Sequence, residues 1–338
     1  MNDEKLLNEY FGENETSINI ALSYSRVSDF SKNGPGALIR RSEIDTNSVR
    51  IGSITDDLLN DGFVLEDKYY IFDGKKPTAT LGSLADIITN NYNEMPDDAA
   101  ILNIINNNNF WKRSKDETKL ETIKDDDFRN YLNAFYESKK KIVLSTNDYA
   151  LGKELADTIR IHPFSQHIFS EDYERYTQFK FNIKYKGLRF RGIMDFVLID
   201  HKNKTVNLID LKTGKDQCLH FMNNFIKYKY YFQECIYMKA FKFICKELGL
   251  KGYNLLPFKF LYISRYEKIP LEYTVTKKWH NAAIKGFITD SGYKYKGLDE
   301  TIEDIKWHWQ NKVFDLPREV YEANGVKLLN DEFIKVNE

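Results

Sequence analysis

The stretch of residues 178–212 constrains the fold of this chain more than any other part of the sequence. Over residues 179–185 every second side chain is apolar and those between are polar, which is the period of a strand with one buried face. Lys186-Gly187 and the polar residues 201–204 are suited to turns. The pattern predicts a meander of three antiparallel strands, over about 178–185, 188–200 and 205–212.

The two turns determine which residues of the strands face one another. If the first turn is centred between Lys186 and Gly187, Gln178 lies opposite Asp195. If the polar turn is centred between Lys202 and Asn203, Asp195 lies opposite Asp210. Opposed side chains on one face of a sheet have Cβ atoms roughly 5 Å apart. Lys212, two residues beyond Asp210, shares its face. We therefore predict two carboxylates and one lysine side by side, with the carboxylates close enough to share a divalent cation.

An alternative for Asp195 and Asp210 is that they are solvent-facing charges with Lys212 as their partner, because surface ion pairs are common and contribute little. The neighbouring residues argue against it, since 196–199 and 206–209 are nearly continuous apolar runs, typical of strands buried on both faces. Ionised groups that end such strands are costly unless they are paired or bind a metal. The sequence therefore favours a buried acidic site.

Two motifs in this stretch resemble those of a known enzyme family. Gly-Ile-Met-Asp at 192–195, followed by Ile-Asp-Leu-Lys-Thr-Gly at 209–214, resembles the catalytic motif of the PD-(D/E)xK nuclease superfamily. The Asp-x-Lys-Thr-Gly form is similar to the RecB and lambda-exonuclease-like branch, which includes phage-type exonucleases. Gln233 and Tyr237 match the Gln-x-x-x-Tyr motif of that branch, and LSYSRVSDF at 22–30 matches its Ser-x-Ser-x-Leu-x-x-Phe opening.

The resemblance implies an α/β fold, with a restriction-endonuclease-like mixed central β-sheet flanked by helices and interrupted by a helical insertion. The flanking helices are expected near residues 26, 52, 146 and 217, the last as one long helix over 217–248. The expected organisation is an N-terminal helical part of the nuclease domain at 1–60, an insertion at 61–145, and the nuclease core with a C-terminal tail at 146–338.

The resemblance also implies a metal-dependent phosphodiesterase that acts on DNA, with Asp195, Asp210 and Lys212 as catalytic residues. The two aspartates are expected to hold Mg²⁺ or Mn²⁺, which prefer oxygen ligands, and Lys212 to orient or deprotonate the attacking water. Gln178 stands where relatives often carry a glutamate that helps to hold the metal, and its amide supplies only a carbonyl oxygen. Asp56 stands where relatives have a histidine, and is expected to be a further metal ligand or a solvated charge on a helix.

Several residues are expected to contact the DNA strand. In the family, the residues that match Gln233 and Tyr237 lie beside the active site and contact nucleic acid; the alternative is a core tyrosine with a glutamine that satisfies a buried polar group. Ser25 belongs to the N-terminal motif and is also suited to cap a helix that runs through Phe30. By the same register, four basic side chains share the face of Asp195 and either follow the phosphate backbone or form a solvated sheet face: Lys180, Lys184, Arg189 and Arg191.

The composition of the chain bears on its DNA-binding surface, its cofactors and its location in the cell. A net charge of -1 gives no general basic field, so any DNA-binding surface has to be local. Three cysteines without a Cys-x-x-Cys pair indicate free thiols in a reducing compartment, and they are too few for the four-cysteine iron-sulfur cluster of some relatives. The N-terminus lacks the apolar core of a signal peptide, and no stretch approaches the ~20 apolar residues of a membrane span. We expect a cytoplasmic protein, located in the host cytoplasm if it is viral. We expect it to bind DNA and a recombination or replication protein, and not to bind a membrane.

Three functions are compatible with these residues. The first is a DNA exonuclease that acts in recombination, repair or replication. The second is a catalytically silent DNA-binding or structural factor on the same fold, against which the intact set of two aspartates and one lysine argues. The third is a sequence-specific endonuclease, which would need a recognition subdomain that only residues 61–145 are available to form.

Overall fold

The computed structural model describes residues 21–39, 47–138, 141–289 and 292–326. The chain divides into two compact units: residues 1–44 with 162–338, called here the sheet unit, and residues 45–161, called here the helical unit. The insertion predicted at 61–145 lies within the helical unit. The division into two compact units does not test the predicted domain limits, which stay a prediction. Of the predicted C-terminal tail, residues 327–338 lie outside the described residues.

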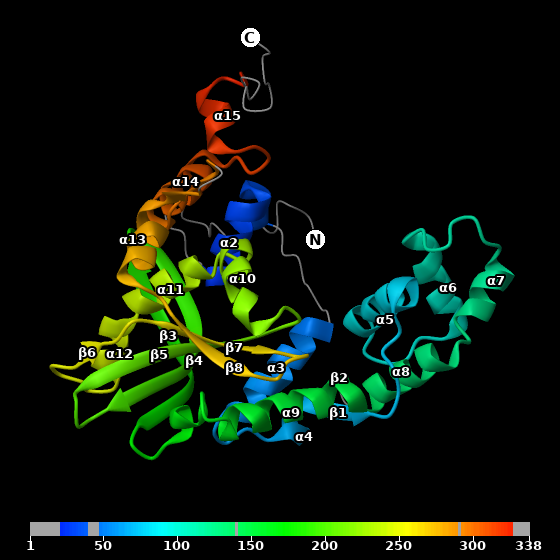
Figure 1. The fold of residues 1–338 in the computed structure, drawn as a ribbon. Coiled ribbons are helices and arrows are strands. Elements are labelled where there is room, and N and C mark those ends of the chain that lie inside the picture. Colours follow the sequence, from blue (N-terminus) through cyan, green and yellow to red (C-terminus); the bar gives the residue numbers. More distant parts are fainter. Residues whose placement is uncertain (1–20, 40–46, 139–140, 290–291, 327–338) are drawn as a thin grey trace, which may run out of the picture. The chain divides into compact units, whose positions relative to one another are not determined.

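The sheet unit is built on a mixed β-sheet, which confirms the predicted fold class (Figure 1). The strand order is β3-β4-β5-β7-β8, and the short β6 pairs with β5. β3, β4 and β5 are antiparallel neighbours, β5 and β7 run parallel, and β7 and β8 are antiparallel. The strands are β3 (Glu174–Tyr185), β4 (Leu188–Asp200), β5 (Thr205–Gly214), β6 (Asn254–Leu255), β7 (Lys259–Ser264) and β8 (Pro270–Thr274).

The first predicted hairpin is present with the predicted register. The turn at Lys186-Gly187 joins the paired residues Tyr185 and Leu188, and φ is positive at both turn residues, 46° and 86°. This is the backbone of a two-residue hairpin turn, and glycine adopts it without a steric penalty. The same offset continues along β3 and β4 and places Gln178 opposite Asp195.

The second hairpin also has the predicted offset. The ladder between β4 and β5 runs from the polar turn as far as Phe196 and Ile209, and it ends there. Asp195 and Asp210 are the next residue on each strand beyond this last pair. The two turns and the period of two were therefore sufficient to place the two aspartates beside each other.

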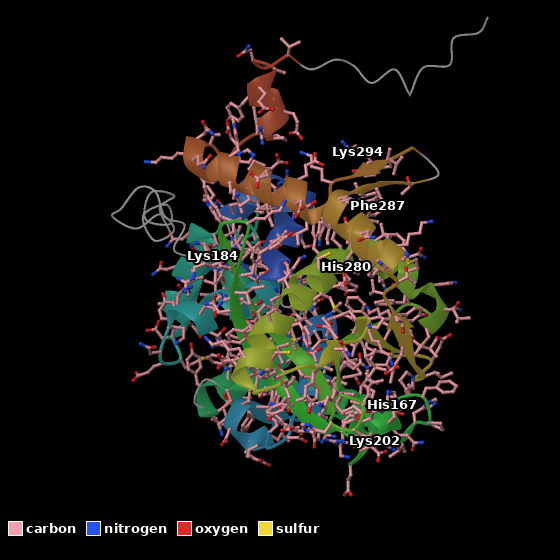
Figure 2. All side chains as sticks on the ribbon, turned by 90° about the vertical axis from the view of Figure 1, so that its left-hand side faces the viewer. His167, Lys184, Lys202, His280, Phe287 and Lys294 are labelled. Atoms are coloured by element: carbon pink, nitrogen blue, oxygen red, sulfur yellow. The ribbon has the colours of Figure 1, made fainter. Side chains whose placement is uncertain are left out.

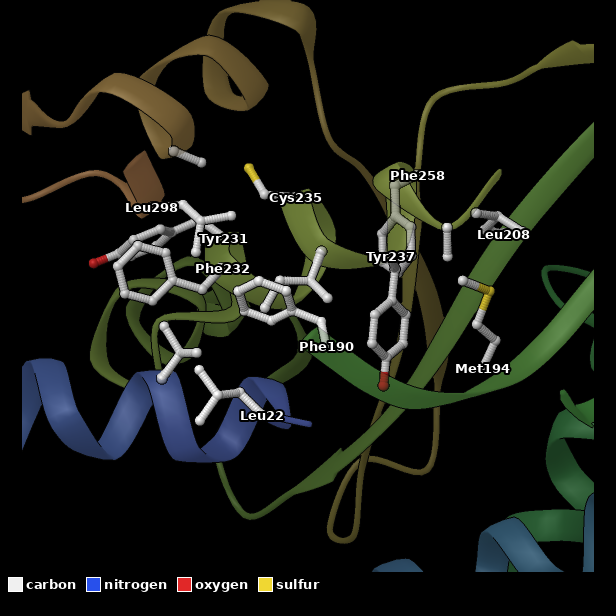
Figure 3. Packing of buried hydrophobic residues seen from close by; sticks show 14 of the residues in the cluster. Leu22, Phe190, Met194, Leu208, Tyr231, Phe232, Cys235, Tyr237, Phe258 and Leu298 are labelled. Atoms are coloured by element: carbon white, nitrogen blue, oxygen red, sulfur yellow. The ribbon is translucent and has the colours of Figure 1, made fainter. Parts of the chain in front are cut away.

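Helices cover one face of the sheet (Figure 1). They are η3 (Cys218–His220), α10 (Phe221–Lys227), α11 (Tyr230–Lys239) and α12 (Phe241–Glu247), with α2 (Tyr24–Asn33) beside β4. The core between these layers is apolar and largely aromatic. Phe190, Met194 and Leu208 of the sheet pack in one cluster with Tyr237 and Phe258 (Figure 3).

The single long helix predicted over 217–248 is wrong, because the segment is broken into η3, α10, α11 and α12. The break between α10 and α11 is at Lys229, which has a left-handed φ of 56° and whose N–H bonds to the carbonyl of Ile226. No glycine or proline marks this break, so in the sequence the apolar residues keep their helical spacing across Lys229. Gln233 and Tyr237 nevertheless share α11, one turn apart as predicted.

The start of α2 also differs from the prediction. The N-cap is Ser23, whose side chain accepts from the N–H of Arg26 at 3.3 Å, and Ser25 lies in the first turn. The helix starts early because Leu22 forms a parallel bridge with Phe190 of β4, in which its N–H donates to the carbonyl of Arg189 and its carbonyl accepts from the N–H of Arg191, so the chain leaves the sheet at Ser23.

The remaining elements complete the two units. The sheet unit also has η1 (Pro35–Leu38), η2 (Gln166–Phe169), α13 (Lys277–Lys285), β9 (Phe287–Ile288), β10 (Lys294–Tyr295), α14 (Leu298–Asn311) and α15 (Arg318–Glu322). The helical unit has α3 (Asn47–Leu59), α4 (Leu65–Lys68), β1 (Tyr69–Phe72), α5 (Ala79–Asn91), α6 (Asp98–Asn107), α7 (Asp116–Thr122), α8 (Asp126–Glu137), β2 (Ile142–Ser145) and α9 (Thr146–Ile161). It has an apolar core of its own, which includes Leu84, Ile101 and Phe128. Among the described helices of both units, none is long and apolar enough to cross a membrane.

Gly192 offers a test of the packing between β3, β4 and α11. A Cβ atom at this position would lie 2.5 Å from Cζ of Phe181 and 2.9 Å from Cε1 of Tyr237. Because both rings are held in the core, we expect Gly192→Ala to lower the free energy of unfolding by about 1–3 kcal/mol. Urea denaturation of this variant, of Phe181→Leu and of the double variant gives the coupling energy. A coupling energy near zero would contradict the close contact.

Candidate active site

Asp195 lies at the point where β4 and β5 separate. Beyond the last ladder pair, the backbone N–H of Leu211 donates to Oδ2 of Asp195 at 2.7 Å, so a side chain replaces a strand carbonyl as its acceptor. The side-chain amide of Gln178 donates to Oδ1 of Asp195 at 3.3 Å, as the predicted register requires. Both donors are neutral, so they position the carboxylate without neutralising its charge.

Asp210 is 2% exposed, and both of its carboxylate oxygens are bonded. The amide of Gln233 donates to one oxygen at 2.5 Å, and the Lys212 ammonium contacts the other. Burial raises the pKa of Asp210 above its ordinary value, and the charge of Lys212 opposes this effect. A carboxylate this deeply buried is costly unless it is paired, so Lys212 and Gln233 are the groups that make its position tenable.

Aromatic rings surround the other side of Lys212. Its Nζ lies 4.9 Å from the ring centroid of Tyr230 and 5.9 Å from that of Phe260, both within the range of cation–π attraction. Burial disfavours the charged lysine, but Asp210, Tyr230 and Asp195 outweigh burial and raise the pKa of Lys212 above its ordinary value. These contacts favour the ammonium form of Lys212, in which the side chain donates hydrogen bonds.

Neither ring is among the residues predicted for the site from the sequence. Tyr230 precedes Gln233 by three residues on α11, and this helical spacing is a signal that could have identified it. Phe260 has no comparable signal, because it reaches the site through the parallel pairing of β7 with β5, where it is the partner of Asp210. A long-range crossover of this kind leaves no periodic trace in the sequence.

The backbone is strained beside Asp195. Gln178 has a φ of 51° within β3, a left-handed conformation that costs a non-glycine residue on the order of 1–2 kcal/mol. Strained residues of this kind cluster at functional sites, where the surrounding structure holds them in place. The strain lies at the residue whose side chain reaches Asp195.

A cleft of about 690 Å³ brings together four of the residues predicted to bind nucleic acid: Ser25, Lys180, Arg191 and Tyr237. The hydroxyl of Tyr237 donates to the carbonyl of Ile193 at 2.9 Å, and Ile193 lies two residues before Asp195. Tyr237 is thus a buried ring that also lines the cleft, so the two roles considered for it are not exclusive.

The other predicted residues lie elsewhere in the chain. Arg189 is exposed and paired across the hairpin with Lys184, which is labelled in Figure 2, so both extend the row of Arg191 along the sheet. Asp56 lies on α3 of the helical unit, near Tyr69, whose pKa it helps to raise after burial and Asp57. The role predicted for Asp56 in binding metal stays a prediction.

The donor set fits a hard divalent cation. The candidate ligand atoms are all oxygens, from the carboxylates of Asp195 and Asp210 and the amides of Gln178 and Gln233. Within the described residues, no donor reaches the buried Oε1 of Gln233, which leaves an acceptor beside Asp210 for a cation or its water shell. The two carboxylates and the Lys212 ammonium together carry one negative charge in excess. Mg²⁺ and Mn²⁺ favour such oxygen-rich, negatively charged sites.

Comparison with known proteins gives one family. A profile of the PD-(D/E)XK nuclease superfamily matches residues 89–312, more than half of the chain. No curated protein sequence matches the chain. Among solved structures, a protein from Eubacterium rectale provisionally described as an exonuclease is 12% identical, with 95% of this chain and 93% of that chain covered and a TM-score of 0.44. A protein from Vibrio cholerae is 13% identical, with 89% and 64% covered and a TM-score of 0.19.

Substitution of Gln178 tests whether its amide belongs to a metal site. We expect Gln178→Ala to weaken Mn²⁺ binding and Gln178→Glu to strengthen it, because the added carboxylate beside Asp195 increases the attraction for a cation. Isothermal titration calorimetry with Mn²⁺ measures both effects. Asn182→Asp is the matched control, since it makes the same amide-to-acid change four residues along β3. Equal gains in affinity for Gln178→Glu and Asn182→Asp would indicate a general charge effect and no specific ligand.

Proposed function

The chain belongs to the PD-(D/E)XK nuclease superfamily, and we propose that it is a metal-dependent deoxyribonuclease that hydrolyses DNA from an end. Superfamily membership accounts for the nuclease reaction. The exonuclease mode and a place in recombination, repair or replication are supported by the resemblance of two motifs, Asp-x-Lys-Thr-Gly at 210–214 and Gln-x-x-x-Tyr at 233–237, to the RecB and lambda-exonuclease-like branch.

The observation that carries the proposal is the convergence of Asp195, Asp210, Lys212 and Gln233 where β4 and β5 separate. A buried ion pair is weak evidence for a stabilising role, because its replacement by apolar residues is often neutral or stabilising. A silent binding protein would therefore gain nothing from keeping this pair, whereas a phosphodiesterase uses both charges.

Each residue has a role in the proposed chemistry. Asp195 and Asp210 would hold the cation, and the amide oxygens of Gln178 and Gln233 would reach it directly or through water. When bound, the cation polarises the scissile phosphate and lowers the pKa of a bound water. Lys212 donates to the phosphate or to the water and offsets the negative charge that develops at phosphorus.

The cleft lined by Ile193 and Tyr237, on the strand that carries Asp195 and the helix that carries Gln233, is the proposed path of the DNA strand. Lys180 and Arg191 line it and supply positive charge for phosphate oxygens, and Ser25 supplies a hydroxyl. Arg189 extends the basic row, and Asp56 is proposed as a further metal ligand. A protein partner from a recombination or replication complex, and a cytoplasmic setting, are proposed on the resemblance alone.

The first prediction concerns catalysis. Asp195→Asn keeps an oxygen that accepts from the Leu211 N–H but loses the charge that binds metal, so we expect cleavage to fall by about 10²–10⁴-fold with little change in melting temperature. The assay follows digestion of linear, nicked and closed circular DNA with Mg²⁺ or Mn²⁺. Asp200→Asn, the same change at the other end of β4, is the control and should retain full activity.

The substrates separate the candidate functions. An exonuclease degrades linear DNA and leaves closed circles intact, whereas cleavage of closed circles would identify an endonuclease. A wild-type protein that binds DNA but cleaves none of the three forms with either metal is the silent factor. Wild-type activity in Asp195→Asn would remove Asp195 from the mechanism.

The second prediction concerns the cleft. If Arg191 contacts a phosphate, Arg191→Gln should weaken DNA binding to a similar extent for all sequences and reduce the slope of log affinity against log salt by about 1. Fluorescence anisotropy at several salt concentrations, with EDTA present to prevent cleavage, measures this slope. Lys202→Gln, in the turn between β4 and β5, is the matched control (Figure 2). Unchanged slopes in both variants would mean that the basic row is a solvated sheet face.

A further inference from the structure

A second group of ligand-type side chains lies between α11 and α13. Glu234 and Cys235 are consecutive residues of α11, and His280 belongs to α13, where Figure 2 labels it. One donor atom from each, a carboxylate oxygen, the thiol sulfur and a ring nitrogen, lies within 4.8 Å of the other two. Nδ1 of His280 lies 2.7 Å from Oε1 of Glu234.

The second observation is an unsatisfied carboxylate oxygen. Glu234 is 1% exposed, and in the described part of the chain no hydrogen-bond donor meets its Oε2. A buried carboxylate with only one oxygen bonded carries an uncompensated desolvation cost. Cys235 is fully buried beside it, with its sulfur directed away from Tyr237 in Figure 3. A cation bound by the Glu234 carboxylate, the Cys235 sulfur and the His280 ring would remove this desolvation cost.

We propose that Glu234, Cys235 and His280 form a zinc site that fixes α11 to α13. Thiolate sulfur, imidazole nitrogen and carboxylate oxygen are the three ligand types that Zn²⁺ accepts in proteins. Mg²⁺ and Mn²⁺ do not favour thiolate, so this site differs in selectivity from the oxygen set around Asp195 and Asp210. The His280 side chain is 26% exposed, which gives a water molecule access as fourth ligand.

Binding requires a proton balance at the thiol. Burial, and then Glu234, raise the pKa of Cys235 well above its ordinary value, so the metal-free protein carries a thiol. Zn²⁺ displaces the thiol proton to solvent, and His280 binds as the neutral imidazole. The cation then compensates the two negative charges of Glu234 and Cys235 that the apolar surroundings would otherwise penalise.

The site would act on the nuclease centre through one helix. Gln233, which bonds to Asp210, directly precedes Glu234, and Tyr237 follows Cys235 by two residues. Residues on opposite sides of one turn move together, so a metal that ties α11 to α13 also fixes the position of Gln233. The proposal does not depend on the nuclease activity.

The test uses the full-length, untagged protein and Co²⁺ as a visible substitute for Zn²⁺. We expect one equivalent of Co²⁺ to give the thiolate-to-cobalt charge-transfer band in the near ultraviolet, Zn²⁺ to abolish the band by displacement, and Zn²⁺ to raise the melting temperature. Cys235→Ser should lose the band and Glu234→Gln should weaken it. Cys245→Ser, a partly buried thiol on α12, is the matched control and should retain it. Asp195→Asn should retain it too, which separates this site from the catalytic metal.

Two outcomes overturn the proposal. The first is a wild-type protein with no charge-transfer band in excess Co²⁺ and no rise in melting temperature with Zn²⁺, which would leave only the hydrogen bond between Glu234 and His280. The second is a band that survives Cys235→Ser and disappears in Cys245→Ser, which would place the metal elsewhere. If Cys235→Ser does not fold, the wild-type titration and Glu234→Gln decide the question.

Discussion

The buried contact between Asp210 and Lys212 is the interaction around which the candidate site of the sheet unit is arranged. A carboxylate at 2% exposure is tolerated only because Lys212 and the Gln233 amide occupy its two oxygens. This requirement fixes the position of α11 above β5, and the hydroxyl of Tyr237 on the carbonyl of Ile193 fixes the same helix above β4. The helix thus packs through apolar rings and is aligned by two polar contacts at the site itself.

The two aspartates have different surroundings, and this difference follows from where the ladder ends. Asp210 lies against α11 and is paired with a cation, whereas Asp195 takes the place of a backbone acceptor for Leu211 and receives the amide of Gln178. A regular ladder at this point would close the space between the strands, because paired strands lie about 4.8 Å apart. The Asp195 side chain bonds the Leu211 N–H itself, so the strands separate without an unsatisfied backbone donor.

The meander could be predicted from the sequence because its register depends on local information. The turn at Lys186-Gly187 needs two left-handed residues, and the alternation of 179–185 leaves one face for the core, so a shift of one residue would expose the apolar set. Lys229 shows the opposite case, since a left-handed lysine divides the predicted helix with no glycine or proline to mark it. The positions of the Tyr230 and Phe260 rings around Lys212 depend on how α11 and β7 pack against β5, which is decided by tertiary packing and not by local sequence.

The prediction for Asp56 rested only on a sequence motif, and this residue lies in the helical unit.

The two proposed metal sites lie on different sides of α11, and their ligands differ in softness. Gln233 faces the oxygen ligands of the sheet, whereas Cys235, two residues on and so about 200° around the helix, faces α13. Mg²⁺ would therefore favour the oxygen set, because it does not favour thiolate, whereas Zn²⁺ would favour the set that contains Cys235 and His280. It follows that a chelator strong enough to remove both cations would stop cleavage in two ways: by emptying the catalytic site and by freeing the helix that carries Gln233. Recovery with Mg²⁺ alone would show that only the first effect operates, because Mg²⁺ does not favour the site that contains a thiolate, whereas recovery that needs Zn²⁺ as well would show both effects.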